Sequence, residues 1–77
     1  MIDRLIPLEL MQSGETGCIH DVNGTDDVVH RLSEMGLATG TPVQMVRPGT
    51  PCILASGEHR LSVRVDASLS ILVSVAD

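Results

Sequence analysis

Residues 28–43 read VVHRLSEMGLATGTPV, and this stretch encodes a helix, its end and the start of a strand. Val28, Leu32 and Met35 follow one another at spacings of four and three residues, so they form one apolar stripe of an amphipathic helix. Gly36 comes next, at a position where a left-handed residue commonly ends a helix, and Leu37 can then fold back onto the last turn. We therefore expect Met35 and Leu37 to lie in the core.

The flanks of this helix carry further signals. Either Thr25 or Asp26 can cap its N-terminus, and Asp26 and Asp27 place negative charge in the first turn, where the helix dipole favours it. After the helix, residues 39–42 predict a turn because they contain Gly40 and Pro42. The alternating residues that follow predict a strand over 43–47.

The remaining apolar runs predict short strands. Residues 18–22 form one, ended by a turn at Asn23 and Gly24, and the others span 52–55, 59–65 and 70–75. Residues 8–10 fit either a short strand or one helical turn, and residues 66–69 fit a single helical turn capped by Asp66. About five strands with one amphipathic helix indicate a mainly β, small barrel in a single domain over residues 1–77, with its core at about 5–76.

Composition excludes several classes of function. The chain has no Phe, Tyr or Trp, so its core must be aliphatic, and it lacks the aromatic rings that stack on bases or line grooves for proline-rich peptides. Ten acidic residues against five arginines and no lysine give a net charge of −5, which repels nucleic acid and anionic lipid. No apolar run is long enough to cross a membrane, and the first residues do not resemble a signal peptide. We expect a cytoplasmic protein that inserts in no membrane.

Reactive side chains are few. Cys18 and His20 lie two apart on a predicted strand and so face one side, which makes them candidate metal ligands that Cys52, His30 or His59 could join. However, the sequence has no C-x-x-C or H-x-x-x-H spacing, and Cys is commonly a small buried apolar residue. We therefore expect no dedicated metal site or cofactor, and reduced thiols.

Catalytic motifs are also missing from the sequence. It contains no nucleophile elbow, phosphate-binding loop or dinucleotide fingerprint. A Cys nucleophile paired with one of the three histidines is the arrangement that the residue types would still permit. We expect a protein that is not an enzyme.

The sequence of residues 31–43, RLSEMGLATGTPV, resembles the signature of the FeoA family, roughly R-L-x-E-[LM]-G-[LIM]-x-x-G-x-x-[VI]. The resemblance extends over about residues 5–76, including residues 8–14, Gly17, Val63 with Arg64, Ala67, and Ile71 with Val73. It implies a small cytosolic SH3-like barrel associated with bacterial ferrous iron uptake, which acts with the membrane transporter FeoB. The same fold occurs as the C-terminal domain of metal-responsive repressors.

The resemblance leads to one main hypothesis and two alternatives. The main hypothesis is a non-catalytic accessory protein that binds and modulates a FeoB-like transporter. The alternatives are a transition-metal sensor or carrier using Cys and His ligands, and a detached effector-sensing domain of a metal-dependent repressor. Exposed strand edges would also permit a homo-oligomer. The exposed loop at 47–51 is a candidate docking edge, and the predicted partner-binding residues are Arg31, Glu34, Arg47, Arg60 and Arg64.

Overall fold

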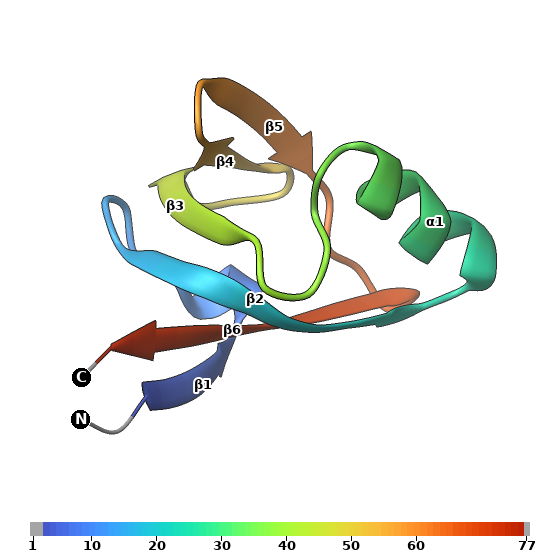
Figure 1. Ribbon diagram of the computed structural model, residues 1–77, viewed down its shortest axis with the longest axis horizontal. Coiled ribbons are helices and arrows are strands. Elements are labelled where there is room, and N and C mark those ends of the chain that lie inside the picture. The colour runs from blue at the N-terminus through green and yellow to red at the C-terminus, as the bar shows by residue number, and fades with distance from the viewer. Residues whose placement is uncertain (1–2, 77) are drawn as a thin grey trace.

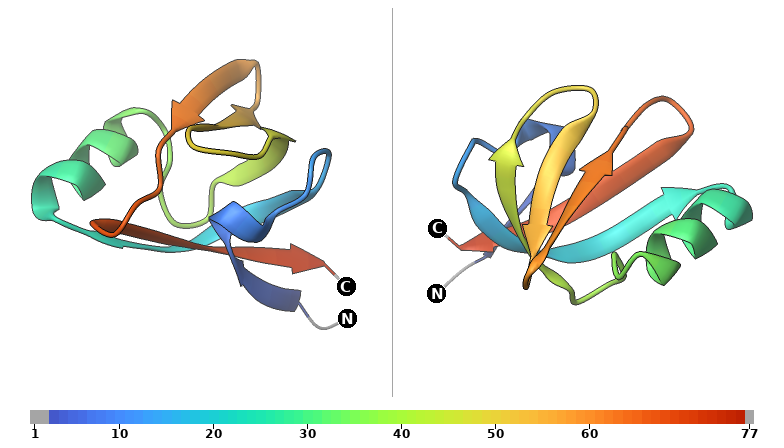
Figure 2. Two further views of the ribbon diagram at one scale, coloured as in Figure 1. Left: turned by 180° about the vertical axis from the view of Figure 1, so that it is seen from behind. Right: turned by 90° about the horizontal axis from the view of Figure 1, so that it is seen from above.

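One curled antiparallel sheet and one α-helix make up the computed structural model, which describes residues 3–76 (Figure 1). The strand order in the sheet is β1-β6-β2-β3-β4-β5, so β1 and β5 are its two edges, which lie at opposite ends of the left view in Figure 2. The elements are β1 (Asp3–Pro7), the 3-10 helix η1 (Leu8–Leu10), β2 (Thr16–Gly24), α1 (Asp26–Glu34), β3 (Pro42–Arg47), β4 (Cys52–Ser56), β5 (His59–Val63) and β6 (Leu69–Ala76). The ends of the predicted domain, residues 1–2 and 77, lie outside the described residues.

The mainly β fold with one helix confirms the predicted class, but the strand β1 was not predicted. It pairs antiparallel with β6, from Asp3 opposite Ala76 to Pro7 opposite Leu72. An edge strand tolerates proline because one of its sides makes no ladder hydrogen bonds, so Pro7 can end β1 there. Directly after it, residues 8–10 form the helical turn that was one of the two predicted alternatives.

The predicted turn at Asn23 and Gly24 is wrong, because β2 continues through both residues. They pair with Ser70 and Leu69 of β6. A Cβ atom on Gly24 would lie 2.9 Å from the carbonyl oxygen of Ser68, so glycine serves here for close approach of two strands. The Asn23 amide meanwhile donates to the Asp21 carboxylate over 2.7 Å.

The ends of α1 confirm the predicted start and stop signals. At the N-terminus, the Val28 amide donates to the Thr25 hydroxyl over 3.4 Å. At the C-terminus, Gly36 has a φ of 91° and the Leu37 amide donates to the Leu32 carbonyl over 2.8 Å, which is a Schellman motif. Leu37 is buried as expected.

The predicted burial of Met35 is wrong. Its exposed fraction is 39%, whereas that of Leu37 is 1%. The helix ends at Glu34, so Met35 is already the C-cap residue, and the reversal at Gly36 brings Leu37 to the core in its place.

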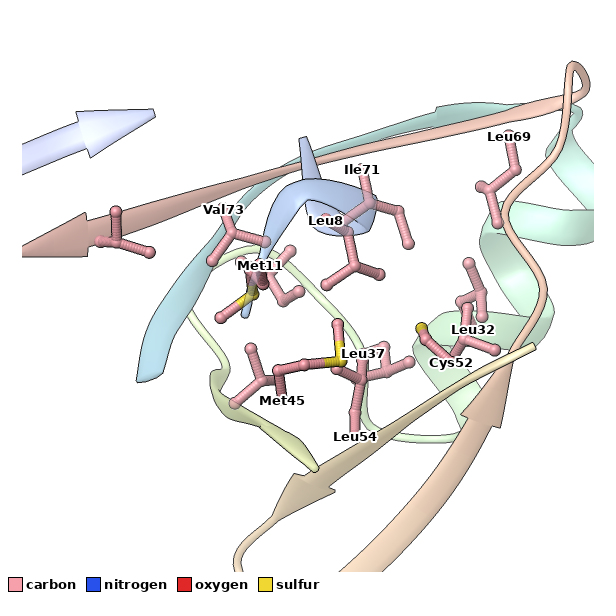
Figure 3. Packing of buried hydrophobic residues seen from close by; sticks show 14 residues of the cluster. Leu8, Met11, Leu32, Leu37, Met45, Cys52, Leu54, Leu69, Ile71 and Val73 are labelled. Carbon is pink, nitrogen blue, oxygen red and sulfur yellow. The ribbon is translucent and has the colours of Figure 1, made fainter. Parts of the chain in front are cut away.

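The core is a single cluster of aliphatic side chains and one thiol. β6 contributes every second residue, because side chains alternate between the two faces of a strand. Figure 3 shows the cluster converging from the sheet, η1 and the loop after α1. Its members are Leu8, Met11, Ile19, Leu32, Leu37, Val43, Met45, Cys52, Leu54, Val63, Leu69, Ile71, Val73 and Val75.

The connection from β5 to β6 also differs from its prediction. The strand expected over 59–65 ends at Val63, and residues 66–69 form one hydrogen-bonded turn, with Leu69 donating to the Asp66 carbonyl over 3.1 Å. The Asp66 carboxylate accepts from the hydroxyl and the amide of Ser68, at 2.6 and 2.8 Å. These two hydrogen bonds, with a smaller contribution from the Arg64 charge, lower the pKa of Asp66.

Candidate interaction surface

The predicted metal ligands Cys18 and His20 are both exposed on β2, on either side of the buried Ile19. A bulge lies between Ile19 and Asp21, which pair with Val73 and Leu72, so His20 has no partner residue on β6. Such an extra residue disturbs the alternation that would place the two side chains on one face. Within residues 3–76, no three His, Cys, Asp or Glu side chains come close enough to hold a metal ion.

Cys52, a further candidate ligand, belongs to the core. Its exposed fraction is 2%, and it is a free thiol next to Leu32 in Figure 3. Burial raises the pKa of the Cys52 thiol, which keeps it in the neutral form. A neutral buried thiol is neither a nucleophile nor a metal ligand, so Cys18 is the accessible cysteine of the pair.

Two of the predicted partner-binding residues lie on α1. Arg31 is exposed. Glu34 Oε1 lies 2.7 Å from Nε2 of His30, one helical turn earlier, and the two form an ion pair when His30 is protonated. Both side chains of this pair are mostly in solvent, so the pair contributes little stability.

Of the other three predicted residues, Arg47 and Arg60 lie on one face of the sheet, and Arg64 directly follows β5. Arg47 of β3 lies opposite Ile53 of β4, which lies opposite Ser62 of β5. Residues opposite each other on antiparallel strands point to the same face, so Arg47 and Ser62 share the face that looks away from the core. Arg60 is two residues before Ser62 and Arg64 two residues after it, and both are exposed.

We call this surface the arginine face; its strand residues are Arg47, Ile53, Ala55, Arg60 and Ser62, and we include Arg64, the first residue after β5. A hollow of about 360 Å³ opens at one end of it, lined by Ile53, Ser62 and residues 47–51. The predicted docking loop and the arginines of the sheet are thus parts of one surface. Sequence reasoning missed Ile53 and Ser62, since only the strand register places them between the arginines.

A second hollow lies along the junction of β2 and β3 and shares Ala55 with the arginine face. It has a volume of about 550 Å³ and is lined mostly by small side chains, among them Gly17, Cys18, Ala55 and Ser74. Of its lining residues in the described chain, Cys18 alone carries a thiol, imidazole or charged group. The lining of this hollow therefore does not contain the pair of acid and base side chains that general acid–base catalysis needs.

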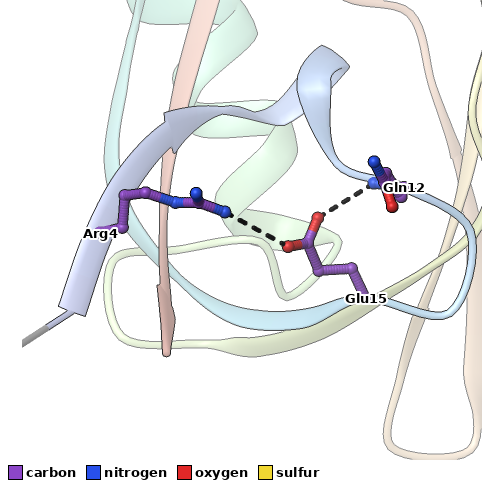
Figure 4. A network of polar contacts seen from close by, with 3 residues as sticks. All are labelled: Arg4, Gln12 and Glu15. Carbon is purple, nitrogen blue, oxygen red and sulfur yellow. Dashed lines mark hydrogen bonds and ion pairs between the residues drawn. The ribbon is translucent and has the colours of Figure 1, made fainter. Parts of the chain in front are cut away.

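One ion pair and one hydrogen bond connect the turn before β2 to β1. Glu15 accepts the backbone amide of Gln12 at 3.0 Å and contacts Arg4 at 4.0 Å (Figure 4). These contacts fix the segment before β2, so Arg4 has a structural partner.

Comparison with known families now identifies the chain's relatives. A model of the FeoA domain family matches residues 6–75. The chain belongs to the FeoA family. A crystal structure of an iron uptake regulatory protein, also a FeoA, superimposes with a TM-score of 0.80 at 23% identity, covering 94% of this chain and all of that one. A search of curated proteins found no match.

FeoA membership confirms the resemblance that residues 31–43 suggested, and the structural match confirms the SH3-like fold. In this FeoA chain the signature encodes the end of α1, the Schellman turn and the start of β3. Family membership supports a role in ferrous iron transport. No helix among the described residues of this FeoA is long and apolar enough to span a bilayer.

Proposed function

We propose that this chain is a non-catalytic, cytosolic accessory protein of bacterial ferrous iron uptake, which binds and modulates a FeoB-like membrane transporter. The observation that carries the proposal is the FeoA family match over residues 6–75. The burial pattern supports it, because among residues 3–76 the buried residues are all apolar and no charged side chain is buried. A protein of this kind acts by docking, with no reactive group of its own.

The test is calorimetry with the purified cytosolic domain of a FeoB-like transporter, repeated with GDP, a GTP analogue and Fe(II). Interfaces of small adaptor proteins are often weak, so both proteins should reach high micromolar concentration. We expect saturable one-to-one binding in at least one nucleotide state. An absence of binding in every nucleotide and iron state would contradict the proposal.

Direct metal binding is the second candidate function, favoured by the exposure of Cys18 and His20 on one strand. It predicts Fe(II) or Zn(II) binding that weakens as pH falls, since both ligands must lose a proton. Cys18→Ser or His20→Ala should abolish this binding, while His59→Ala, at an exposed histidine on β5, should not. Equal affinity in all three variants would exclude the site.

A further inference from the structure

Basic and acidic residues are separated along this chain. Residues 42–65, which form β3, β4 and β5, contain three arginines and one acid, Glu58, for a net charge of +2. The rest of the chain contains two arginines and nine acids, for a net charge of −7. A protein with overall charge −5 thus carries a local positive surface, which is the arginine face.

The arginine side chains of this face are not used to stabilise the fold. Arg47, Arg60 and Arg64 are exposed, and within residues 3–76 none of their guanidinium groups makes a hydrogen bond or an ion pair. Asp66 is near enough to Arg64 to feel its charge, but its carboxylate is held by Ser68. Glu58 lies in the turn between β4 and β5. Three guanidinium groups are therefore available to an outside acid.

The arginine face ends in an open strand edge. β5 pairs with β4 along one side, from Cys52 opposite Val63 to Ser56 opposite His59, and no strand among residues 3–76 pairs with its other side. An unpaired edge presents a row of backbone donors and acceptors that only another polypeptide matches. Figure 1 shows β5 at the outer limit of the molecule, away from β1.

We propose that β5 binds an acidic, extended protein segment, which adds to the sheet as a further strand and places its carboxylates against Arg60 and Arg64. The hollow lined by Ser62 and Ile53 opens on the same face, so a long side chain of the added strand can reach across β5 into it. This inference rests on the proposed function, since the segment belongs to the protein that the accessory chain binds.

The observations favour a peptide over other polyanions. The net charge of −5 repels nucleic acid and anionic membranes. The face also has no lysine to bind phosphate and no aromatic ring to stack on a base. Neither polyanion offers backbone groups to the edge of β5. An acidic strand uses both the charge of the face and the hydrogen bonds of the edge, which is the general mode of strand addition.

The probe is a fluorescein-labelled peptide about eight residues long with alternating Glu and Val, a length typical of strands. Its controls are the same peptide with Lys for Glu, and one N-methylated at alternate residues so that one edge cannot pair. Binding to the full chain is followed by fluorescence anisotropy at low and high salt and by amide chemical shifts. A short DNA strand tests for general polyanion binding.

We expect the acidic peptide to bind, with affinity falling as salt rises, and the largest amide shifts to occur in β5. Arg60→Glu should weaken binding at least about fivefold. The matched control is Arg31→Glu on α1, which makes the same change in net charge at an exposed, unpaired arginine and should leave binding unchanged. Circular dichroism confirms that both variants fold.

Four outcomes would overturn the proposal. They are no binding at millimolar peptide, an equal loss in Arg31→Glu, equal binding of the N-methylated peptide, and equal binding of DNA with the same shifts. Arginines that only protect the edge from aggregation would give the first of these outcomes.

The two proposals can fail separately. If the transporter domain binds the chain but Arg60→Glu binds it as well as the natural sequence does, the function stands and the surface is wrong. If the acidic peptide binds but no transporter domain does, the surface stands and its partner lies elsewhere.

Discussion

The two halves of the sheet share one core but differ on their outer faces. In the half made of β1, β6 and β2, the outer face carries Leu5 and Cys18 on either side of Ser74 and an acid, Asp21, opposite Leu72. In the half made of β3, β4 and β5, the outer face carries Arg47 and Arg60. Inner positions are constrained by close packing, whereas outer positions tolerate any residue that solvent accepts. The difference therefore places the interaction chemistry in the second half.

The largest expected loss of stability comes from core substitutions, one in each half, which test whether the two inner faces contribute equally to the free energy of unfolding. Leu54 of β4 and Ile71 of β6 have exposed fractions of 0% and 1%, so Leu54→Ala and Ile71→Ala should each lower the free energy of unfolding by about 2–5 kcal/mol. Urea unfolding followed by circular dichroism measures both. A cost below about 1 kcal/mol for only one of them would mean that its half contributes little to the core.

The next effect concerns the junction of the halves at Gly17, which pairs with Val43 of β3. A Cβ atom there would lie 2.6 Å from Val73 Cγ1 and 2.7 Å from the Ser74 carbonyl oxygen. Because backbone cannot yield as a side chain does, Gly17→Ala should cost about 1–3 kcal/mol by overpacking. Urea unfolding measures it, and an unchanged midpoint would show that the junction is looser than the distances imply.

A smaller effect is expected at the end of α1, which covers the core beside both halves. Gly36 has a φ of 91° and open space around its missing Cβ, so Gly36→Ala should cost about 1 kcal/mol through backbone conformation alone. Ser33→Ala, at an exposed helix position, is the matched control and should change stability by less than about 0.5 kcal/mol. Equal unfolding midpoints for the two variants would argue against the Schellman stop.

The smallest effect concerns Asp66, in the connection between β5 and β6. Hydrogen bonds from Ser68 lower the pKa of Asp66 below its ordinary value of 3.8, so near that pH the unfolded chain binds more protons than the folded one. This stabilisation is complete above pH 3.8 and is lost as pH falls through the lowered value. Unfolding midpoints of the natural chain and Asp66→Ala should therefore converge as pH falls below 3.8. If the two unfolding midpoints differ by the same amount at every pH, the lowered pKa of Asp66 does not contribute to stability.

Local signals in the sequence predicted most of the elements. The apolar spacing and Thr25 predicted α1, Gly36 predicted its end, and alternation predicted the buried set of β6. The strand β1 was missed because its residues lack a clear alternating pattern, and its pairing with β6 comes from the far end of the chain. The turn expected at Asn23 and Gly24 failed for a similar reason, since pairing with β6 outweighed the local turn preference.

The candidate surface was predicted residue by residue but not as a surface. The sequence indicated that Arg47, Arg60 and Arg64 are exposed, and so they are. It grouped them with Arg31 and Glu34, which the structure places on α1. The grouping could not be predicted because it depends on the register that sets Arg47 opposite Ile53 and Ile53 opposite Ser62. Register between distant strands is a property of the assembled sheet.

By itself, the sequence determined the class of fold, the aliphatic core, the glycine-ended helix and the family, because all of these depend on neighbours along the chain. The tertiary structure decided which strands are edges, that Leu37 is buried while Met35 is exposed, and that Arg47 and Arg60 share one face. These features depend on contacts between residues that are distant in sequence. Such contacts form only when the whole sheet closes around its core, and no local pattern specifies them.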